Sequence, residues 1–146
     1  LAAPLAAARR ALDRVCFTTA WRAVIATVHK LLLEEVVLEA RFTIPGALQL
    51  NIDGDAFISV LRPYHRRPEN FFKELKEACA LLSLDPATAS SLAAILETVS
   101  EDSQGSETTE DPDLRQKELR AVLEKYHVRK MTPEHAARVL AQRDKV

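Results

Sequence analysis

The sequence predicts an all-α fold from its composition, its low glycine content and the spacing of its apolar residues. The 146 residues include only 3 glycines and 5% aromatic residues, whereas Ala, Leu, Glu, Lys and Arg are plentiful. These residues have the highest helix propensities, and the scarcity of β-branched and aromatic runs argues against a sandwich or barrel. The chain is 47% hydrophobic, enough for one core. We therefore expect a single helical bundle of about six helices, in which shorter antiparallel helices pack on a long N-terminal one.

The first element should be a long helix from about residue 5 to residue 41, or two nearly continuous helices, because no proline or glycine follows until residue 45. Apolar residues recur along it at three- and four-residue steps. They are Phe17, Trp21, Val24, Ile25, Val28, Leu31, Leu32 and Val36. This stripe is too wide for one partner helix. Pro45 and Gly46 should end the element, since proline lacks the amide and glycine opens turn conformations.

A second helix is expected from about Asp53 to Tyr64. Asp53 or Asp55 should cap its start and Pro63 should close its last turn. The run from Asn51 to Asp55 also invites a calcium-loop interpretation. With Gly54 at the sixth position, however, the twelfth position would be Val60 instead of the glutamate that such a loop needs.

A third helix should begin at Pro68, in the favoured first-turn position, and run to about Ser83. Its predicted buried face consists of Phe71, Phe72, Leu75, Ala78, Cys79 and Leu82. Glu69, Lys73 and Glu77 are spaced four apart and should face solvent.

The sequence divides into a main bundle over residues 1–100, an acidic linker over 101–113 and a C-terminal hairpin over 114–146. Asp85-Pro86 should start a fourth helix, and Asp111-Pro112 and Thr132-Pro133 the two hairpin helices. The expected inward residues are Leu92, Ile95, Leu96 and Val99 in the fourth helix, then Leu119, Val122, Leu123 and Tyr126, and finally Ala136, Val139 and Leu140. The linker should be flexible, and the hairpin must lean on the bundle because it carries too little apolar surface alone.

The formal net charge is −1, but the charged residues are unevenly distributed along the chain. Residues 101–113 contain six acids and no base, and residues 114–146 contain nine bases against four acids. The longest uncharged runs have 11 residues, well short of the roughly 20 needed to span a bilayer. Cys16 and Cys79 show neither disulfide nor zinc spacing, which fits a reducing, cytosolic setting. The chain starts without methionine and is expected to be a fragment of a longer protein.

No motif predicts catalysis, a metal or a cofactor. The sequence has no nucleophile elbow, phosphate-binding glycine loop or paired-histidine metal helix. The four histidines, at positions 29, 65, 127 and 135, never occur four residues apart on one helix. We therefore expect a protein that is not an enzyme.

The segment from Arg62 to Phe72 is the most distinctive local feature. Its candidate partner-binding residues are Arg62, Tyr64, His65, Arg66 and Arg67. Exposed arginines bind phosphate or anionic lipid well, but cations at a helix C-terminus are also favoured by the helix dipole. The segment is therefore interpreted mainly as a corner between two helices, with Tyr64, His65 and Arg66 as its exposed part. Binding of anionic lipid or nucleic acid is the alternative.

A longer pattern resembles a known family. It comprises Leu48-Gln49-Leu50-Asn51-Ile52-Asp53, then Phe57, Pro63, Arg67-Pro68-Glu69-Asn70-Phe71-Phe72, Glu77-Ala78 and Leu81-Leu82-Ser83-Leu84. This pattern is similar to the C-terminal region of the RINT/TIP family, strongest over residues 48–84 and extending to the Thr132–Arg143 ending. The motif residues expected to serve structure are Asp53, Phe57, Pro63, Pro68, Glu69, Phe71 and Phe72.

The resemblance implies the terminal domain of a tether-type helical rod, within a subunit of the Dsl/NRZ complex that acts in Golgi-to-ER retrograde transport. It implies no catalysis and a peripheral location on the cytosolic face of the endoplasmic reticulum. The implied partners are an ER SNARE, with the N-terminal domain of a Qb-type SNARE as the natural candidate, and other tether subunits reached through upstream chain. Nucleic acid is not expected as a partner, because the basic residues 114–146 are interspersed with acids and offer almost no aromatic side chain for stacking.

Overall fold

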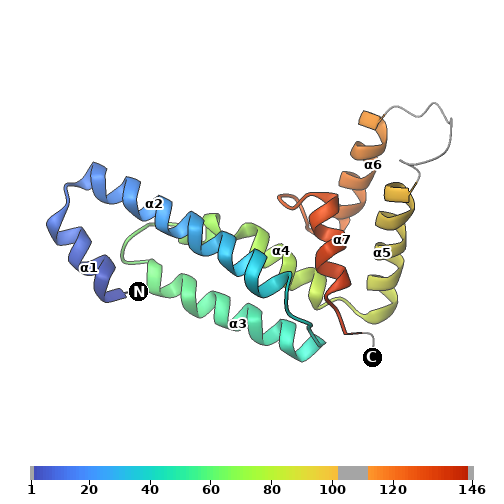
Figure 1. Cartoon of the computed structure of the whole chain (residues 1–146), viewed down its shortest axis with the longest axis horizontal. Coiled ribbons are helices and arrows are strands. Elements are labelled where there is room, and N and C mark those ends of the chain that lie inside the picture. Colours follow the sequence, from blue (N-terminus) through green and yellow to red (C-terminus); the bar gives the residue numbers. More distant parts are fainter. Residues whose placement is uncertain (1, 102–111, 145–146) are drawn as a thin grey trace.

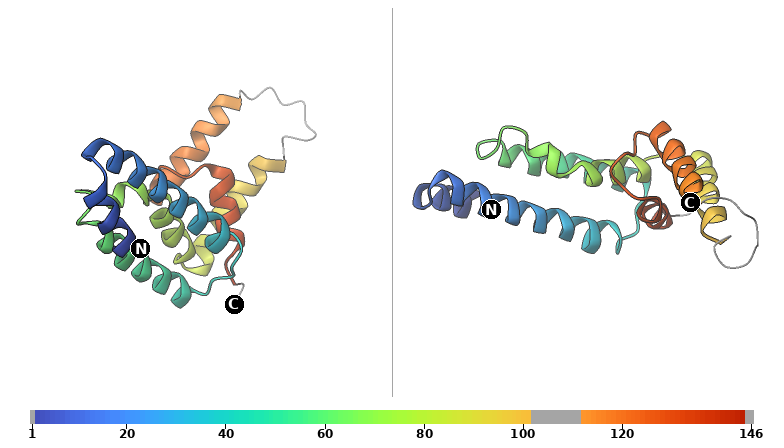
Figure 2. Two further views of the ribbon diagram at one scale, coloured as in Figure 1. Left: turned by 60° about the vertical axis from the view of Figure 1, so that its left-hand side comes forward. Right: turned by 90° about the horizontal axis from the view of Figure 1, so that it is seen from above.

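The computed structural model describes residues 2–101 and 112–144, and these residues form helices with no β-strand, which confirms the all-α prediction (Figure 1). The elements in chain order are α1 (Ala2–Ala11), α2 (Arg14–Leu31), the π-helical segment η1 (Leu32–Val37), α3 (Ile44–Leu61), the 3-10 turn η2 (Pro68–Phe71), α4 (Lys73–Leu82), α5 (Pro86–Glu101), α6 (Pro112–Lys125) and α7 (Pro133–Ala141). Helices α1 to α4 occupy one end of an elongated molecule and α5 to α7 the other. In the right-hand view of Figure 2, α2 lies in one layer, and α3 and α4 lie in a second layer beside it.

The N-terminal helix is broken between Ala11 and Arg14, so the prediction of one long helix is wrong and the two-helix alternative is closer. The Asp13 carboxylate accepts hydrogen bonds from the amides of Val15 at 2.8 Å and Cys16 at 2.9 Å, which caps α2. These bonds also lower the pKa of Asp13. The cap lets α1 turn back against the start of α2 (Figure 1).

The predicted apolar stripe is only partly buried. Phe17, Trp21 and Ile25 belong to the core, whereas Val24, Leu31 and Val36 are exposed. The π-helical segment explains the end of the stripe, because its wider turn rotates the inward face so that Val37 and Leu38 are buried in place of Val36.

Helix α3 begins at Ile44, nine residues before the predicted start at Asp53. Thr43 caps it by accepting a hydrogen bond from the Gly46 amide, and Pro45 lies in the first turn, where its missing amide costs nothing. Pro45 and Gly46 therefore open a helix instead of ending one. The predicted caps are mid-helix residues: Asp53 accepts from Gln49 Nε2 at 2.8 Å, and Asp55 pairs with Lys76. Helix α3 ends at Leu61 with Arg62 as its C-cap, so Pro63 follows the helix instead of lying in its last turn, and the end comes three residues before the predicted Tyr64.

The expected third helix is divided. Pro68 opens the 3-10 turn η2, and α4 begins only at Lys73, after the non-helical backbone of Phe72. The predicted buried face is confirmed for Phe72, Leu75, Ala78, Cys79 and Leu82, and Phe71 is half-buried. The prediction that Glu77 faces solvent is wrong, as its contacts below show.

Of the two predicted hairpin helices, α7 packs on α4 and α5, and α6 packs on α7. Asp85 caps α5 through the Thr88 amide, and Thr132 caps α7 through the His135 amide. Leu92 and Leu96 are buried, but Ile95 is exposed, contrary to prediction. The predicted inward residues of α6 and α7 are buried or half-buried. The side chain of Val99 and most of the predicted acidic linker lie outside the described residues.

Helix α7 packs on α4 and α5, and two polar attachments hold it there. The Glu77 carboxylate of α4 accepts hydrogen bonds at 2.8 to 3.0 Å from three successive backbone amides, those of Arg129, Lys130 and Met131. Arg143 donates from its guanidinium to the carbonyls of Leu81 and Leu84, and its backbone pairs with Phe42 in an isolated bridge. The chain therefore turns back at both ends of α7 onto elements far away in sequence.

Candidate interaction surfaces

The corner between α3 and α4, residues 62–67, mixes exposed and packed side chains. Arg62, Arg66 and Arg67 are exposed, but the His65 ring stacks on Trp21 with 4.8 Å between ring centroids and an interplanar angle of 8°. The edge of Phe71 meets the same ring at 5.3 Å. His65 Nδ1 also accepts a hydrogen bond from the Arg67 amide. His65 is thus a packing residue of the corner.

Tyr64 also makes contacts within the molecule. Its hydroxyl donates to the carbonyl of Ala2 at 2.9 Å, and its ring lies 6.3 Å from Phe17. Tyr64 and His65 are half-buried, so the expectation that they form the exposed part of the corner is wrong. Arg62, Arg66 and Arg67 remain available to a partner, and their binding role stays a prediction.

The motif residues of the predicted corner largely serve the core. Phe72 is fully buried and meets Phe57 edge-to-face at 5.6 Å, Phe71 meets Trp21 in the same way at 5.2 Å, and Pro68 is buried. Glu69 and Asp53 are exposed. The aromatic members of the motif therefore pin η2 and the start of α4 between α2 and α3.

The structure brings three more arginines to this end of the molecule. Arg9 and Arg10 end α1 and Arg14 begins α2, and Arg9 Nη1 donates to the Pro63 carbonyl at 2.7 Å. Leu12, in the turn between these helices, is 42% exposed, and Val15, in the first turn of α2, is 75% exposed. We call the six residues Arg9, Arg10, Arg14, Arg62, Arg66 and Arg67 the arginine end. Sequence reasoning missed half of it, because about 50 residues separate the two arginine groups.

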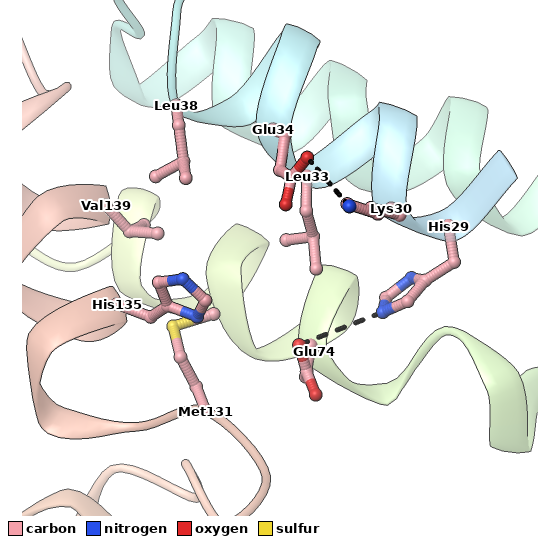
Figure 3. Close-up of a pocket in the computed structure, with 9 residues that line it drawn as sticks. All are labelled: His29, Lys30, Leu33, Glu34, Leu38, Glu74, Met131, His135 and Val139. Carbon is pink, nitrogen blue, oxygen red and sulfur yellow. Dashed lines mark ion pairs between the residues drawn. The ribbon is translucent and has the colours of Figure 1, made fainter. Parts of the chain in front are cut away.

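A small cleft lies where the end of α2 and η1 meet α4 and α7 (Figure 3). Its volume is about 130 Å³, and its lining residues are His29, Lys30, Leu33, Glu34, Leu38, Glu74, Met131, His135 and Val139. The floor is apolar and the rim is charged, with Lys30 and Glu34 paired at 3.8 Å. Residues from four elements form the cleft, so no local sequence signal could have predicted it.

His29 links the cleft to the core. Its Nε2 lies 3.9 Å from a Glu74 carboxylate oxygen, and its ring meets Phe72 edge-to-face at 5.6 Å. Its Nδ1 is buried and has no hydrogen-bond partner among the described residues. Burial lowers the pKa of His29, and the negative charge of Glu74 offsets part of that effect.

A second, wider groove of about 1,020 Å³ runs between α5, α7 and the segment that leads into α3. Small side chains of α5 and α7 line much of it, including Ala89, Ser90, Ala93, Ala94, Ala137 and Ala141. Its polar residues are mixed in charge, with Arg41 and Arg143 beside Glu97 and Asp144. Nothing in this lining indicates catalysis.

Chemical sites are not evident in the described part of the chain. No group of three or more His, Cys, Asp or Glu side chains within residues 2–101 and 112–144 is arranged to hold a metal. Both cysteines are free, and burial raises the pKa of Cys79 to about 11, which keeps it a thiol at neutral pH. In the same residues no single helix is long and apolar enough to cross a membrane. The segments Lys73–Leu82 and Pro86–Glu97 pass that test only as a pair, and they meet at a bend of 117°.

The RINT-1/TIP-1 family model matches residues 1–143, which is nearly the whole chain. The chain belongs to this family. It is also 31% identical over 135 residues to a RINT1-like protein of Drosophila melanogaster, a match that covers 92% of this chain and 17% of that relative. The chain thus spans about one-sixth of the length of this curated relative. No solved structure matches it significantly.

Proposed function

We propose that this chain is a non-catalytic protein-interaction domain of a vesicle-tethering subunit that acts in Golgi-to-ER retrograde transport. The observation that carries the proposal is the family match over residues 1–143. The helical bundle supports it, because such a bundle offers long faces and a shallow cleft for a protein partner. We place the domain on the cytosolic face of the endoplasmic reticulum, within a Dsl/NRZ-type complex whose other subunits are reached through other parts of the longer subunit.

The proposed partner is the helical N-terminal domain of a Qb-type ER SNARE, and the proposed docking point is the cleft shown in Figure 3. Leu33 and Leu38 offer an apolar floor for one anchoring side chain of the partner, and the Lys30–Glu34 pair forms a charged rim. An apolar anchor surrounded by polar contacts is the usual arrangement of a binding hot spot.

The cleft suits this role better than the 62–67 corner does. Protein interfaces draw much of their energy from buried aromatic anchors. At the corner, Tyr64 and His65 are already packed against Phe17, Trp21 and Phe71. The corner therefore presents mainly charge, whereas the cleft presents apolar surface that no side chain of the described residues fills.

The test is a calorimetric titration of the chain with purified cytosolic segments of the ER SNAREs. The variant Lys30→Glu with Glu34→Lys exchanges the rim charges while it keeps an i,i+4 ion pair on the helix. We expect saturable binding to one Qb-type segment, weakened about tenfold by this exchange. The matched control is Lys117→Glu with Glu118→Lys, which exchanges charges on exposed residues of α6 and should leave the affinity unchanged.

Two results would count against the proposal in different ways. If no ER SNARE segment binds, the SNARE is not the partner. If a segment binds and the rim exchange has no effect, the partner is correct and the cleft is not its docking point.

A further inference from the structure

We propose that the arginine end binds the anionic surface of a lipid bilayer. This is a second interaction surface, and it does not depend on the SNARE proposal. The two groups of arginines meet because Arg9 donates to the Pro63 carbonyl and Tyr64 donates to the carbonyl of Ala2. The α1–α2 turn and the 62–67 corner therefore form one end of the molecule (Figure 1).

Charge is strongly concentrated at this end. Residues 9–15 and 62–69 contain six arginines and two acids, and the rest of the chain contains fourteen Lys and Arg against nineteen Asp and Glu. All six arginines are exposed. Of the two acids, Asp13 is engaged as the cap of α2, where the helix N-terminus compensates its charge. A net positive end on an otherwise negative molecule orients the protein in the field of an anionic membrane.

Exposed apolar side chains lie within the same surface. Leu12 lies in the α1–α2 turn between Arg10 and Arg14, and Val15 follows Arg14 in the first turn of α2, where it is 75% exposed. Apolar side chains flanked by arginines suit the interfacial region of a bilayer, where the apolar groups enter the acyl boundary and the guanidinium groups meet phosphates. A free phosphate or an acidic peptide would use the arginines alone.

Nucleic acid is a poorer fit for this surface. Proteins that bind single strands combine positive charge with aromatic side chains on which bases stack. The rings in and around the 62–67 corner are those of Trp21, Tyr64, His65 and Phe71, and all of them pack against other rings inside the molecule. The surface therefore has the charge for a phosphate backbone and lacks the stacking platform.

Membrane contact at this end leaves the cleft accessible. Helix α2 has 18 residues, and at about 1.5 Å per residue it places the turn at Arg14 roughly 27 Å from Leu31 beside the cleft. The two surfaces therefore lie toward opposite ends of α2.

The test is co-sedimentation of the chain with phosphatidylcholine vesicles that contain either no anionic lipid or about 30% phosphatidylserine. We expect binding to the anionic vesicles alone, weakened about tenfold when salt is raised from about 0.05 M to about 0.3 M. Arg66→Glu with Arg67→Glu should weaken binding at least about tenfold. Arg120→Glu with Lys125→Glu, on exposed residues of α6, is the matched control and should bind as the unchanged chain does.

Two further arms separate the sources of binding. Val15→Ser removes apolar surface without changing charge, and it should weaken vesicle binding about threefold while circular dichroism stays unchanged. A single-stranded oligonucleotide should bind more weakly than the anionic vesicles do. The proposal is overturned by equal binding to neutral vesicles, by no effect of the Arg66 and Arg67 reversals, by no effect of Val15→Ser, or by preference for the oligonucleotide.

Discussion

At the scale of single residues, the corner shows how a basic sequence motif can serve packing. His65 occurs between a tyrosine and two arginines, and charge alone suggests a surface ligand for phosphate. Its ring instead lies flat on Trp21, a residue 44 positions earlier in the chain. Pro68 and Phe72 could be assigned from sequence, because a helix start and an apolar face are local signals. The partner of His65 could not, because it is set by tertiary packing.

Replacement of His65 by Ala should therefore destabilise the fold. It removes the stacked ring and leaves the Arg67 amide without its acceptor. We expect a loss of about 1 to 3 kcal/mol in the free energy of unfolding, measured by urea denaturation. Arg66→Ala, at the exposed neighbour, should change it by less than about 0.5 kcal/mol. Equal effects of the two substitutions would show that His65 is a surface residue after all.

His29 should make stability depend on pH. Its pKa is lowered in the folded protein, mainly by burial, so below about pH 6.5 the unfolded chain binds more protons than the folded one. The contribution of neutral His29 to the free energy of unfolding is therefore fully present above that pH. It is lost as the pH falls toward the pKa of the folded protein. Wild-type protein should lose more unfolding free energy than His29→Gln between about pH 7.5 and about pH 5.5. Equal losses in the two proteins would contradict this assignment.

At the scale of elements, the main differences between the predicted and the observed helices arise from helix caps and from irregular turns. Pro45 and Gly46 could either end one helix or lie in the first turn of the next. They lie in the first turn of α3, because Thr43 caps the start of that helix. The π-helical segment η1 changes which face of the N-terminal helix is buried, and it has no recognisable signature in a sequence that is apolar on several sides. The same segment supplies Leu33 to the cleft, so an irregular element helps to form the proposed docking point.

The attachment of α7 depends on Glu77. Its carboxylate accepts from three successive amides in the loop that precedes α7, a loop that also contains His127 at a φ of 61°. Glu77→Ala should lower the free energy of unfolding by about 1 to 2 kcal/mol. It should also speed hydrogen exchange at the amides of residues 129–131. Glu118→Ala, an exposed glutamate on α6, is the control. Unchanged exchange in the Glu77 variant would mean that packing alone holds the loop.

At the scale of the whole molecule, the fold class and the family could be predicted from sequence, and the interaction surfaces could not. The fold class is predicted from composition and periodicity, which are sums over many residues. It therefore does not depend on a local error such as the misplaced start of α3. The arginine end and the cleft each combine side chains from segments about 40 to 110 residues apart. Their formation depends on how α1 folds back and where α7 docks. Both surfaces therefore follow from tertiary contacts.

The arginine end and the cleft lie toward opposite ends of α2. We therefore expect the arginine end to contact the membrane while the cleft binds a protein partner. If both proposals hold, the two contacts should form on one molecule at the same time, because the surfaces lie toward opposite ends of α2. A vesicle flotation assay with the chain and the soluble cytosolic segment of the Qb-type SNARE tests this expectation most directly.

We predict that the SNARE segment floats with phosphatidylserine vesicles only when the chain is present. The Lys30 and Glu34 exchange should leave the chain on the vesicles and lose the SNARE segment. Reversal of Arg66 and Arg67 should release both proteins from the vesicles while their complex persists in solution. Displacement of the SNARE segment by the vesicles, so that the two compete for the chain, would contradict the account.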